Sequence, residues 1–297
     1  MIDHGWSAAA SAAGREAARQ CRELGLDPVE LIVVDSSGAG GPEAAARTAR
    51  YRALDEAAQR HRAAAVLLGH TLDDQAETVL LGLARGSGAR SLAGMAAVRG
   101  SYRRPLLGLT RAVTLATCAA LDLEPWLDPA NADPAYARVR LRELAGELER
   151  VLGPGVVPAL ARTADLLRDD ADALDAAALD LLAAADPGQR GELDAETLLG
   201  APVAVRRRTL LAAARVAGSP GGALSHRHAF ALDALLTAGT GATDLPGPVV
   251  ARVVRATRNA AHQGPQQSLV FTTGRRERPG MGNLQPPPDP VPQSEQH

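Results

Sequence analysis

Three acidic residues lie close together in the segment Gly69–Thr78, directly after a short apolar run. Asp74 and Glu77 are three residues apart, so a helix that starts near Asp74 carries both carboxylates on one face and within its first turn. Two such carboxylates can neutralise an ammonium group or hold a metal ion near phosphates. The same spacing also fits a capping box, with Thr71 as the N-cap and Asp74 three residues later. By spacing alone, the capping role is favoured.

A second segment with chemical potential is the loop Arg85–Leu92, which contains the run Gly-Ser-Gly. Gly86 is a suitable residue to end the preceding helix. The free backbone N–H groups of this loop lie between Arg85 and Arg90, a composition that suits phosphates or an RNA backbone. Taken alone, the run is more often a plain connecting loop.

The elements around these segments alternate between helix and strand. Helical patterns cover Ser7–Leu24 and Glu43–His61, and short apolar runs of the kind found in buried parallel strands cover Leu31–Val34 and Ala65–Leu68. This alternation predicts βαβ units and an open α/β sheet. Such sheets bind ligands at the carboxyl ends of their strands, so the residues just after each apolar run are the first candidates for a site.

The second half of the chain has a different character. Helical periodicity covers Leu141–Ala185, Pro202–Ala217 and Ser225–Leu236. Within Ala242–Phe271 we expect a short helix or turn, followed by a strand at Leu269–Phe271. From Pro279 onward proline and glutamine dominate, which predicts a disordered tail.

Composition limits the classes of function. The formal net charge is -2 and all 32 basic residues are arginine, so no lysine side chain is available as a Schiff-base former or phosphate ligand. A nucleic-acid partner would have to meet local arginine patches, such as Arg206–Arg208 or the stripe of Arg252, Arg255 and Arg258. A solvated surface is the commoner role of such a run.

Cysteine usage and hydropathy indicate a cytoplasmic protein. Cys21 and Cys118 lie far apart and form neither a disulfide framework nor a metal-ligand pair. We find neither an apolar run of transmembrane length nor a signal-peptide pattern at the first residues.

Several motifs occur in one order over about residues 2–142. They are Ile2-Asp3-His4-Gly5, Gly69-His70-x-x-Asp73-Asp74-Gln75-Ala76-Glu77-Thr78, Arg85-Gly86-Ser87-Gly88, Gly94-Met95, Arg104-Pro105-Leu106-Leu107 with Arg111, and Asp128-Pro129-x-Asn131-x-Asp133-x-x-Tyr136-x-Arg138-x-x-Leu141-Arg142. This set closely resembles the tRNA(Ile)-lysidine synthetases of the PP-loop ATP pyrophosphatase group. Leu245-Pro246-Gly247 and Leu269-Val270-Phe271 weakly resemble the small tRNA-binding domain of that family.

The resemblance implies a defined reaction. In this family, ATP adenylates the C2 oxygen of the wobble cytidine in a CAU anticodon, and the amine of free L-lysine then displaces AMP to give lysidine. The implied partners are therefore tRNA(Ile), L-lysine, ATP and Mg²⁺, without a membrane. Family members are often homodimers. We recognise no set of metal ligands in the sequence.

The resemblance also assigns roles to individual residues. The implied catalytic residues are Asp74, Glu77, Asp73 and His70, of which Asp74 and Glu77 would bind the lysine ammonium group. The implied nucleotide-binding residues are Asp3, His4, Gly69 and Arg111. The implied tRNA-binding residues are Arg85, Arg90, Arg138, Arg142, Arg206 and Arg207.

The fold implied is an α/β, Rossmann-like (adenine nucleotide alpha hydrolase-like) open parallel sheet, followed by a mainly helical C-terminal domain. We expect a partial PP-loop catalytic domain at 1–140, a helical connector at 141–185, a small tRNA-binding domain at 186–275 and a disordered tail at 276–297. The sheet is expected to lack its first strands, which would leave unpaired edges.

The printed sequence departs from the family in one motif. Ser-Gly-Gly-x-Asp-Ser, which cradles the ATP phosphates, does not occur, and Gly38–Gly41 follows a different strand and lacks the Asp-Ser pair. This departure predicts a chain that starts downstream of its phosphate loop and leaves its activity open. The alternatives are a tRNA-binding remnant without catalysis, a PP-loop thiolation enzyme, which would need Cys-x-x-Cys pairs, and a structural helical protein, which leaves the motif cluster unexplained.

Overall fold

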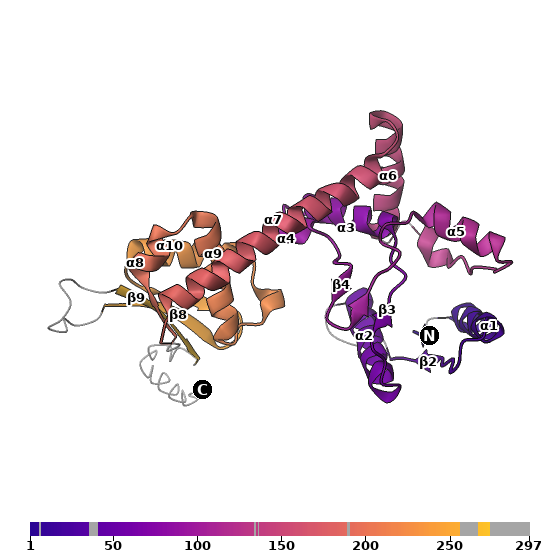
Figure 1. The fold of residues 1–297 in the computed structure, drawn as a ribbon, viewed down its shortest axis with the longest axis horizontal. Helices are drawn as coiled ribbons and strands as arrows, with labels where there is room; N and C mark the ends of the chain where they lie inside the picture. Colours follow the sequence, from indigo (N-terminus) through magenta and orange to yellow (C-terminus); the bar gives the residue numbers. More distant parts are fainter. Residues whose placement is uncertain are drawn as a thin grey trace, which may run out of the picture. The chain divides into compact units, whose positions relative to one another are not determined.

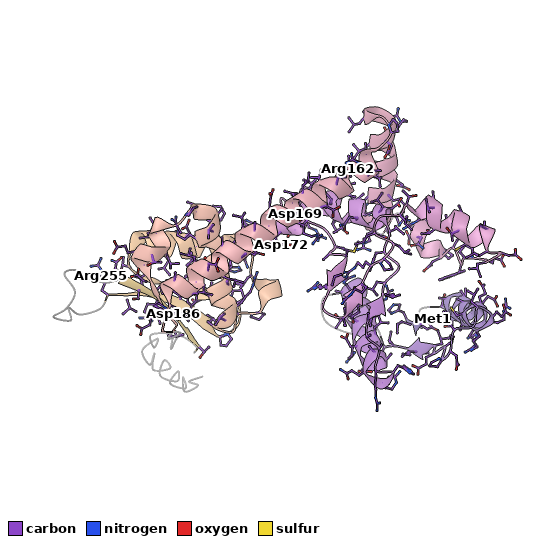
Figure 2. All side chains as sticks on the ribbon, in the orientation of Figure 1. Met1, Arg162, Asp169, Asp172, Asp186 and Arg255 are labelled. Atoms are coloured by element: carbon purple, nitrogen blue, oxygen red, sulfur yellow. The ribbon has the colours of Figure 1, made fainter. Side chains whose placement is uncertain are left out.

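The computed structural model describes residues 1–5, 7–35, 41–133, 135, 137–188, 191–255 and 267–273. The chain divides into two compact units, Met1–Ala171 and Asp172–His297. Figure 1 traces the elements of both units, and in Figure 2 Met1, Arg162 and Asp169 mark the first unit while Asp172, Asp186 and Arg255 mark the second. The four-part division expected from the sequence stays a prediction.

Short strands form two separate sheets in the first unit. In one sheet β1 (Ile2–Asp3) pairs in parallel with β2 (Ile32–Val33). In the other, β3 (Val66–Leu67) pairs in parallel with β5 (Tyr102–Arg103), and β4 (Val98–Arg99) pairs antiparallel with β5. The parallel pairs confirm the α/β class.

The open sheet expected from the sequence is thus divided in two over the part of the chain that the structure describes. Each strand has only two residues, so few hydrogen bonds join neighbouring strands. Some side chains on these strands are exposed to solvent: Val33 of β2 is 69% exposed and Leu67 of β3 is 70% exposed.

The helices of the first unit follow the capping signals of the sequence. They are α1 (Ala8–Glu23), α2 (Pro42–Arg60), α3 (Leu72–Ala84), α4 (Ala89–Leu92) and α5 (Arg111–Ala120). The Ser7 side chain caps α1 by accepting the N–H of Ala10 at 3.1 Å. Pro42 occupies the first turn of α2, where its missing N–H costs nothing.

Helix α3 begins two residues earlier than expected, because Thr71 supplies the N-cap and Leu72 the first helical residue. Its first turn therefore contains Asp73 and Asp74, and the prediction that Glu77 also lies in the first turn is wrong. At the other end, Gly86 takes the left-handed conformation with φ +63°. The N–H of Gly86 bonds to the carbonyl of Leu83 at 3.0 Å, which is the predicted helix stop.

The predicted helical stretch 141–185 is confirmed as two helices, α6 (Ala137–Leu152) and α7 (Val156–Ala185). Gly153 and Gly155 both have positive φ and separate them. Glu149 fixes the bend, since its carboxylate accepts the N–H of Gly155 at 2.7 Å. Helix α7 crosses the boundary between the two units.

Among its described residues, the second unit packs the C-terminal part of α7, three further α-helices and a four-stranded antiparallel sheet around one core. The helices are α8 (Ala195–Gly200), α9 (Val203–Val216) and α10 (His226–Ala238). The strands, in sheet order, are β6 (Glu192–Asp194), β9 (Gln267–Thr273), β8 (Val249–Arg255) and β7 (Ala242–Leu245). Leu198, Leu210, Leu232 and Leu269 are fully buried between these layers.

The sheet of the second unit corrects the sequence analysis. Residues 242–255 form the strands β7 and β8, and the expected turn is only the short connection at 246–248; β6 was not expected either. The sequence of a short strand gives only a weak signal, because pairing with a distant segment decides whether the strand forms. The strand expected at Leu269–Phe271 is confirmed within β9. The predicted tail and Arg258 lie outside the described residues.

One side chain of α3 clamps the loop that follows α4. The amide of Gln75 donates to the carbonyl of Met95 at 3.0 Å and accepts the Met95 N–H at 2.7 Å. Gly94 precedes this contact with φ +60°, and a Cβ added there would lie 2.6 Å from Oε1 of Gln75. The clamp therefore requires glycine at this position.

We expect Gly94→Ala to lower the free energy of unfolding by about 2 kcal/mol, because it combines left-handed strain with a clash at Gln75. The matched control is Gly146→Ala inside α6, where a Cβ meets nothing within 4 Å. The control should instead raise stability by about 0.5–1 kcal/mol. Urea unfolding followed by circular dichroism compares the two, and equal stabilities would show that Gly94 is not under constraint.

Candidate active site at the start of helix α3

The turn between β3 and α3 is organised by the carboxylate of Asp74. Its Oδ2 accepts the backbone N–H of Thr71 at 2.7 Å and the Thr71 hydroxyl at 2.9 Å. Its other oxygen, Oδ1, lies 3.7 Å from Nη2 of Arg111. The capping box is thus real, and it occupies only one of the two carboxylate oxygens.

Asp73 joins two helix N-termini. Its Oδ2 accepts the N–H of Arg111, the first residue of α5, at 2.7 Å. Beside it, the N–H of Leu72 donates to the carbonyl of Leu109 at 2.9 Å. These two bonds fix the start of α5 against the start of α3, so Asp73 acts as an anchor that presents Arg111 to Asp74.

Glu77 is a buried acid with one unused oxygen. Its side chain is 5% exposed, and its Oε1 accepts from Nε of Arg142 on α6 at 3.0 Å. Its Oε2 is buried and has no hydrogen-bond partner among the described residues. Burial raises the pKa of Glu77 above its usual value, although the Arg142 charge opposes that rise. The unused oxygen is therefore available to a ligand that donates a hydrogen bond.

His70 stands at the carboxyl end of β3 and is half-buried. Burial lowers its pKa, and the charges of Arg104, Arg47 and Arg138 lower it further, while Asp74 acts in the opposite direction. The ring is therefore neutral near pH 7. Its Nδ1 is buried without a partner in the described part of the chain, so the ring can offer one hydrogen bond to a ligand.

Two arginines of α2 belong to the same region and were missed by the sequence analysis. Arg50 contacts the ring of His4, with Nη2 3.0 Å from Nε2. Burial lowers the pKa of Arg50, and the nearby charges of Arg47 and Arg138 lower it further. Cations held this close repel one another, so the cluster favours a bound anion. Its sequence signal is the helical spacing of Arg47 and Arg50, three residues apart.

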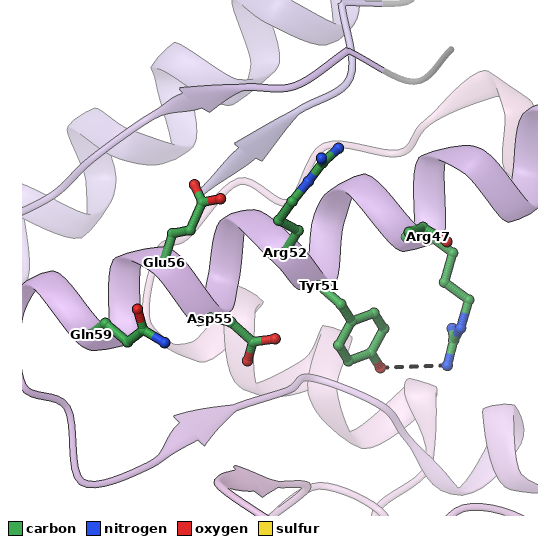
Figure 3. A pocket seen from close by; sticks show the side chains of 7 residues that line it. Arg47, Tyr51, Arg52, Asp55, Glu56 and Gln59 are labelled. Carbon is green, nitrogen blue, oxygen red and sulfur yellow. Dashed lines mark hydrogen bonds between the residues drawn. The ribbon is translucent and has the colours of Figure 1, made fainter. Parts of the chain in front are cut away.

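A hollow of about 510 Å³ lies along α2, lined by residues that include Arg47, Tyr51, Asp55 and Arg52. Figure 3 shows Arg52 on the opposite side of the helix from Tyr51 and Asp55. On the inner side, the Tyr102 hydroxyl donates to Asp55 at 2.6 Å. This bond attaches α2 to strand β5 and so holds the cationic residues of α2 in place.

A neighbouring hollow contains a buried guanidinium. Arg104 is 6% exposed and donates from Nη1 to the carbonyl of Ala96 at 2.7 Å. Its Nε is buried without a partner among the described residues. Arg47, Arg99 and Tyr102 line the same hollow.

Most of the predicted nucleotide-binding residues lie at the strand ends expected for an α/β sheet. Asp3 ends β1, His4 follows it, and Gly69 lies just beyond the end of β3, whereas Arg111 begins helix α5. The carboxylate of Asp3 is used locally, because it accepts the N–H of Gly5 at 2.8 Å. Hydrogen bonds from the Ser11 side chain and Gly5 lower the pKa of Asp3. Asp3 thus shapes the turn that holds His4 against α2.

The arginines predicted to bind tRNA have different surroundings. Arg85 and Arg90 are exposed around the loop after α3. Arg138 is partly buried near Arg50 and His70, and Arg142 is tied to Glu77. In the second unit, Arg206 and Arg207 both bind the carboxylate of Asp233.

We also searched the described residues for metal ligands, paired cysteines and membrane-spanning helices. The described residues contain no group of three or more His, Cys, Asp or Glu placed to hold a metal ion. Cys21 and Cys118 are both free thiols. Among the described helices, none has the length and apolar character needed to cross a membrane.

Comparison with known proteins gives consistent results. The family model described as "PP-loop domain" matches residues 1–148. The tRNA(Ile)-lysidine synthase of Streptomyces coelicolor is 57% identical over 260 residues, which cover 84% of this chain and 73% of that protein. The enzymes of the same name from Thermobifida fusca and Salinispora tropica are 54% and 52% identical, over 83% and 86% of this chain and 76% and 78% of those proteins.

The match over residues 1–148 gives no support to the expectation that the ATP-binding part of this domain is missing. Among solved structures, the U34-tRNA thiolase NcsA from Methanococcus maripaludis with its [4Fe-4S] cluster has a TM-score of 0.45 and 20% identity, covering 57% of this chain and 61% of that one. A likeness at this level bears no weight for function.

The burial of Glu77 predicts a pH-dependent stability. A carboxyl whose folded pKa is raised stabilises the fold most below its unfolded pKa, and that stability is lost as pH rises through the folded pKa. Glu77→Gln removes this titration and keeps an acceptor for Arg142. We expect the melting temperature of the variant to exceed that of the wild type at pH 8 and the gap to close toward pH 4.5. Differential scanning calorimetry checks this, and a gap that does not change with pH would contradict it.

Proposed function

Because the chain belongs to the family of the tRNA(Ile)-lysidine synthases, we propose that it joins L-lysine to C2 of the wobble cytidine in the CAU anticodon of tRNA(Ile), with ATP as the second substrate. The observation that carries the proposal within the site is the pair Asp74 and Glu77. Each carboxylate keeps one oxygen outside the hydrogen bonds that hold it in place. Two such oxygens suit a substrate that enters as an ammonium ion and reacts as an amine.

The proposed reaction has two steps. The C2 oxygen of the cytidine attacks the α-phosphorus of ATP, the bond to the β-phosphate breaks, and pyrophosphate leaves. The lysine amine then attacks C2, the C2–O bond breaks, AMP leaves with that oxygen, and the amine loses a proton. Adenylation converts a poor leaving group into a good one, so the protein's task is to orient the reactants and to neutralise charge.

The carboxylates divide the second step between them. Oδ1 of Asp74 faces the site beside Arg111 and attracts the ammonium group of the incoming lysine. Oε2 of Glu77 is desolvated, and burial raises the pKa of Glu77, which makes it a better proton acceptor at neutral pH. Glu77 therefore takes the proton that the amine must lose. His70 supplies a neutral hydrogen-bonding group at the edge of the same site.

The cationic residues serve the first step. Arg47 and Arg138 present positive charge near the ring of His70, and Arg50, which contacts His4, lies near these two arginines. A triphosphate and the pyrophosphate that leaves are the anions this arrangement fits. Mg²⁺ would enter bound to the phosphates of ATP, as is usual for enzymes that use this nucleotide.

A second candidate is a tRNA-binding protein without catalysis. The match to the PP-loop family model over residues 1–148 does not favour it. The two candidates differ in ATP binding, which only the enzyme needs. A cytoplasmic location and a homodimer are further parts of the enzyme proposal, and sedimentation of the purified chain tests the dimer.

We expect Asp74→Asn and Glu77→Gln each to lower lysidine formation by roughly 100-fold or more, since each removes a charge that acts on the reacting amine. The assay measures incorporation of labelled lysine into a tRNA(Ile) transcript with ATP. The matched control is Glu143→Gln, an exposed acid beside Arg142 on α6, which should retain full activity. Equal activity of all three variants would remove the carboxylates from the mechanism.

For ATP, we expect Arg50→Ala to raise the dissociation constant about tenfold or more, because it deletes a charge-assisted contact to phosphate. Arg52→Ala is the control, since two residues along a helix do not share a face, and Figure 3 shows Arg52 on the opposite side of α2 from Tyr51. Isothermal titration calorimetry measures both. If the wild-type chain fails to bind ATP, the non-catalytic candidate takes precedence. If both variants bind ATP like the wild type, α2 is not the phosphate site.

A further inference from the structure

Helix α10 carries an aromatic side chain that the core does not use. Phe230 is one of only two phenylalanines in the chain, and it is 53% exposed. The guanidinium of Arg207 on α9 stacks over the Phe230 ring at 3.9 Å from its centroid. The ring of His226 stands edge-on to Phe230, with centroids 6.4 Å apart and planes at 86°. What sets this ring apart from the other exposed apolar side chains is its stacking against a guanidinium, which leaves one face of a planar cation–ring pair at the surface.

A buried carboxylate, that of Asp233, holds the guanidinium of Arg207 in this position. Asp233 is 6% exposed and accepts from Nε of Arg206 at 2.7 Å and from Nε of Arg207 at 2.8 Å. Burial acts to raise the pKa of Asp233, but the hydrogen bonds from the two arginines outweigh it and hold the pKa below its usual value. Arg206 also donates to the carbonyls of Leu199 and Ala201, both at 3.3 Å, so it is a structural member of the cluster.

The same arrangement leaves Arg207 only partly occupied. Asp233 binds Arg207 through Nε, and among the described residues no hydrogen bond to protein engages its terminal amino groups. One acid faces two arginines, so the cluster keeps a positive charge. The exposed Arg227 adds another, three residues before Phe230 on the same helix. A fixed planar cation stacked on an exposed ring, within a positive surface, matches a ligand that has both a flat π-face and a negative charge.

We propose that Arg207 and Phe230 form a contact site for RNA, at which an unstacked base lies against the stacked pair and a phosphate meets the amino groups of Arg207. Asp233 is the positioning residue, because it fixes the plane of the guanidinium. The inference rests on the proposed function, in which the RNA is the tRNA substrate. An acidic protein partner would need the charge of Arg207 but not the ring of Phe230.

The test is the affinity of the full chain for a fluorescent tRNA(Ile) transcript, measured by anisotropy at several salt concentrations. Phe230→Ala should raise the dissociation constant about tenfold and leave the salt dependence unchanged, because stacking releases no counterions. Arg207→Ala should raise the dissociation constant and reduce the slope of log K against log salt by about one. Phe230→Trp should preserve binding. Val216→Ala, on an 82% exposed side chain of α9, is the control.

Asp233→Asn separates positioning from folding. It keeps an acceptor for one arginine and should weaken tRNA binding less than Arg207→Ala does, while circular dichroism shows a folded chain. If Arg207→Ala weakens binding but Phe230→Ala does not, base stacking is overturned. If neither variant affects tRNA binding, the site is overturned and the proposed function stands. If the wild-type chain does not bind tRNA at all, the proposed function fails with it.

Discussion

The candidate site depends on how the N-terminus of α3 is satisfied. A helix start leaves backbone N–H groups without partners and concentrates positive potential there. Asp74 binds the N–H and hydroxyl of Thr71, and Asp73 reaches across to the first N–H of α5. Two adjacent acids therefore cap the starts of two helices. The same contacts fix the orientation of Asp74, whose other oxygen lies beside Arg111. Capping and chemistry are not rival roles here, since the cap is what orients the acid.

The centre of the site contains buried polar atoms without hydrogen-bond partners among the described residues, which lowers its stability. Glu77 is buried with one oxygen unsatisfied, His70 has a buried nitrogen without a described partner, and Arg104 has a buried Nε in the same state. Each such group costs free energy in the folded chain. Glu77 lies on α3, while His70 and Arg104 come just after β3 and β5, and a fourth such group, Ser219 Oγ, lies in the second unit. Neighbouring contacts in the first unit, such as the Gln75 clamp on Met95, are complete. Unsatisfied groups gathered in one place within a satisfied frame are typical of a site that awaits its ligands.

Sequence reasoning found the parts of this site that are local and missed those that are not. The helix start at Thr71, the stop at Gly86 and the strand ends were predictable, because capping residues and apolar runs act on their nearest neighbours. The partner of Glu77 was not, since Arg142 is 65 residues away and only the packing of α3 against α6 brings them together. Arg47 and Arg50 were overlooked because an arginine pair on a helix is more often a solvated face. The strands β7 and β8 were overlooked because their pairing, rather than their composition, defines them.

The absence of lysine from the sequence gives the arginines two tasks, and their geometry allows both. Arg142, Arg206 and Arg207 each use the lateral Nε to hold a buried carboxylate. A terminal amino group can then make a second contact: Nη1 of Arg142 donates to the carbonyl of Asn131 at 3.4 Å, and Nη1 of Arg206 donates to two carbonyls of its own unit. A lysine ammonium is one point charge and cannot fix a plane in this way. The same property that lets arginine support Glu77 in the first unit lets Arg207 present a flat cation over Phe230 in the second.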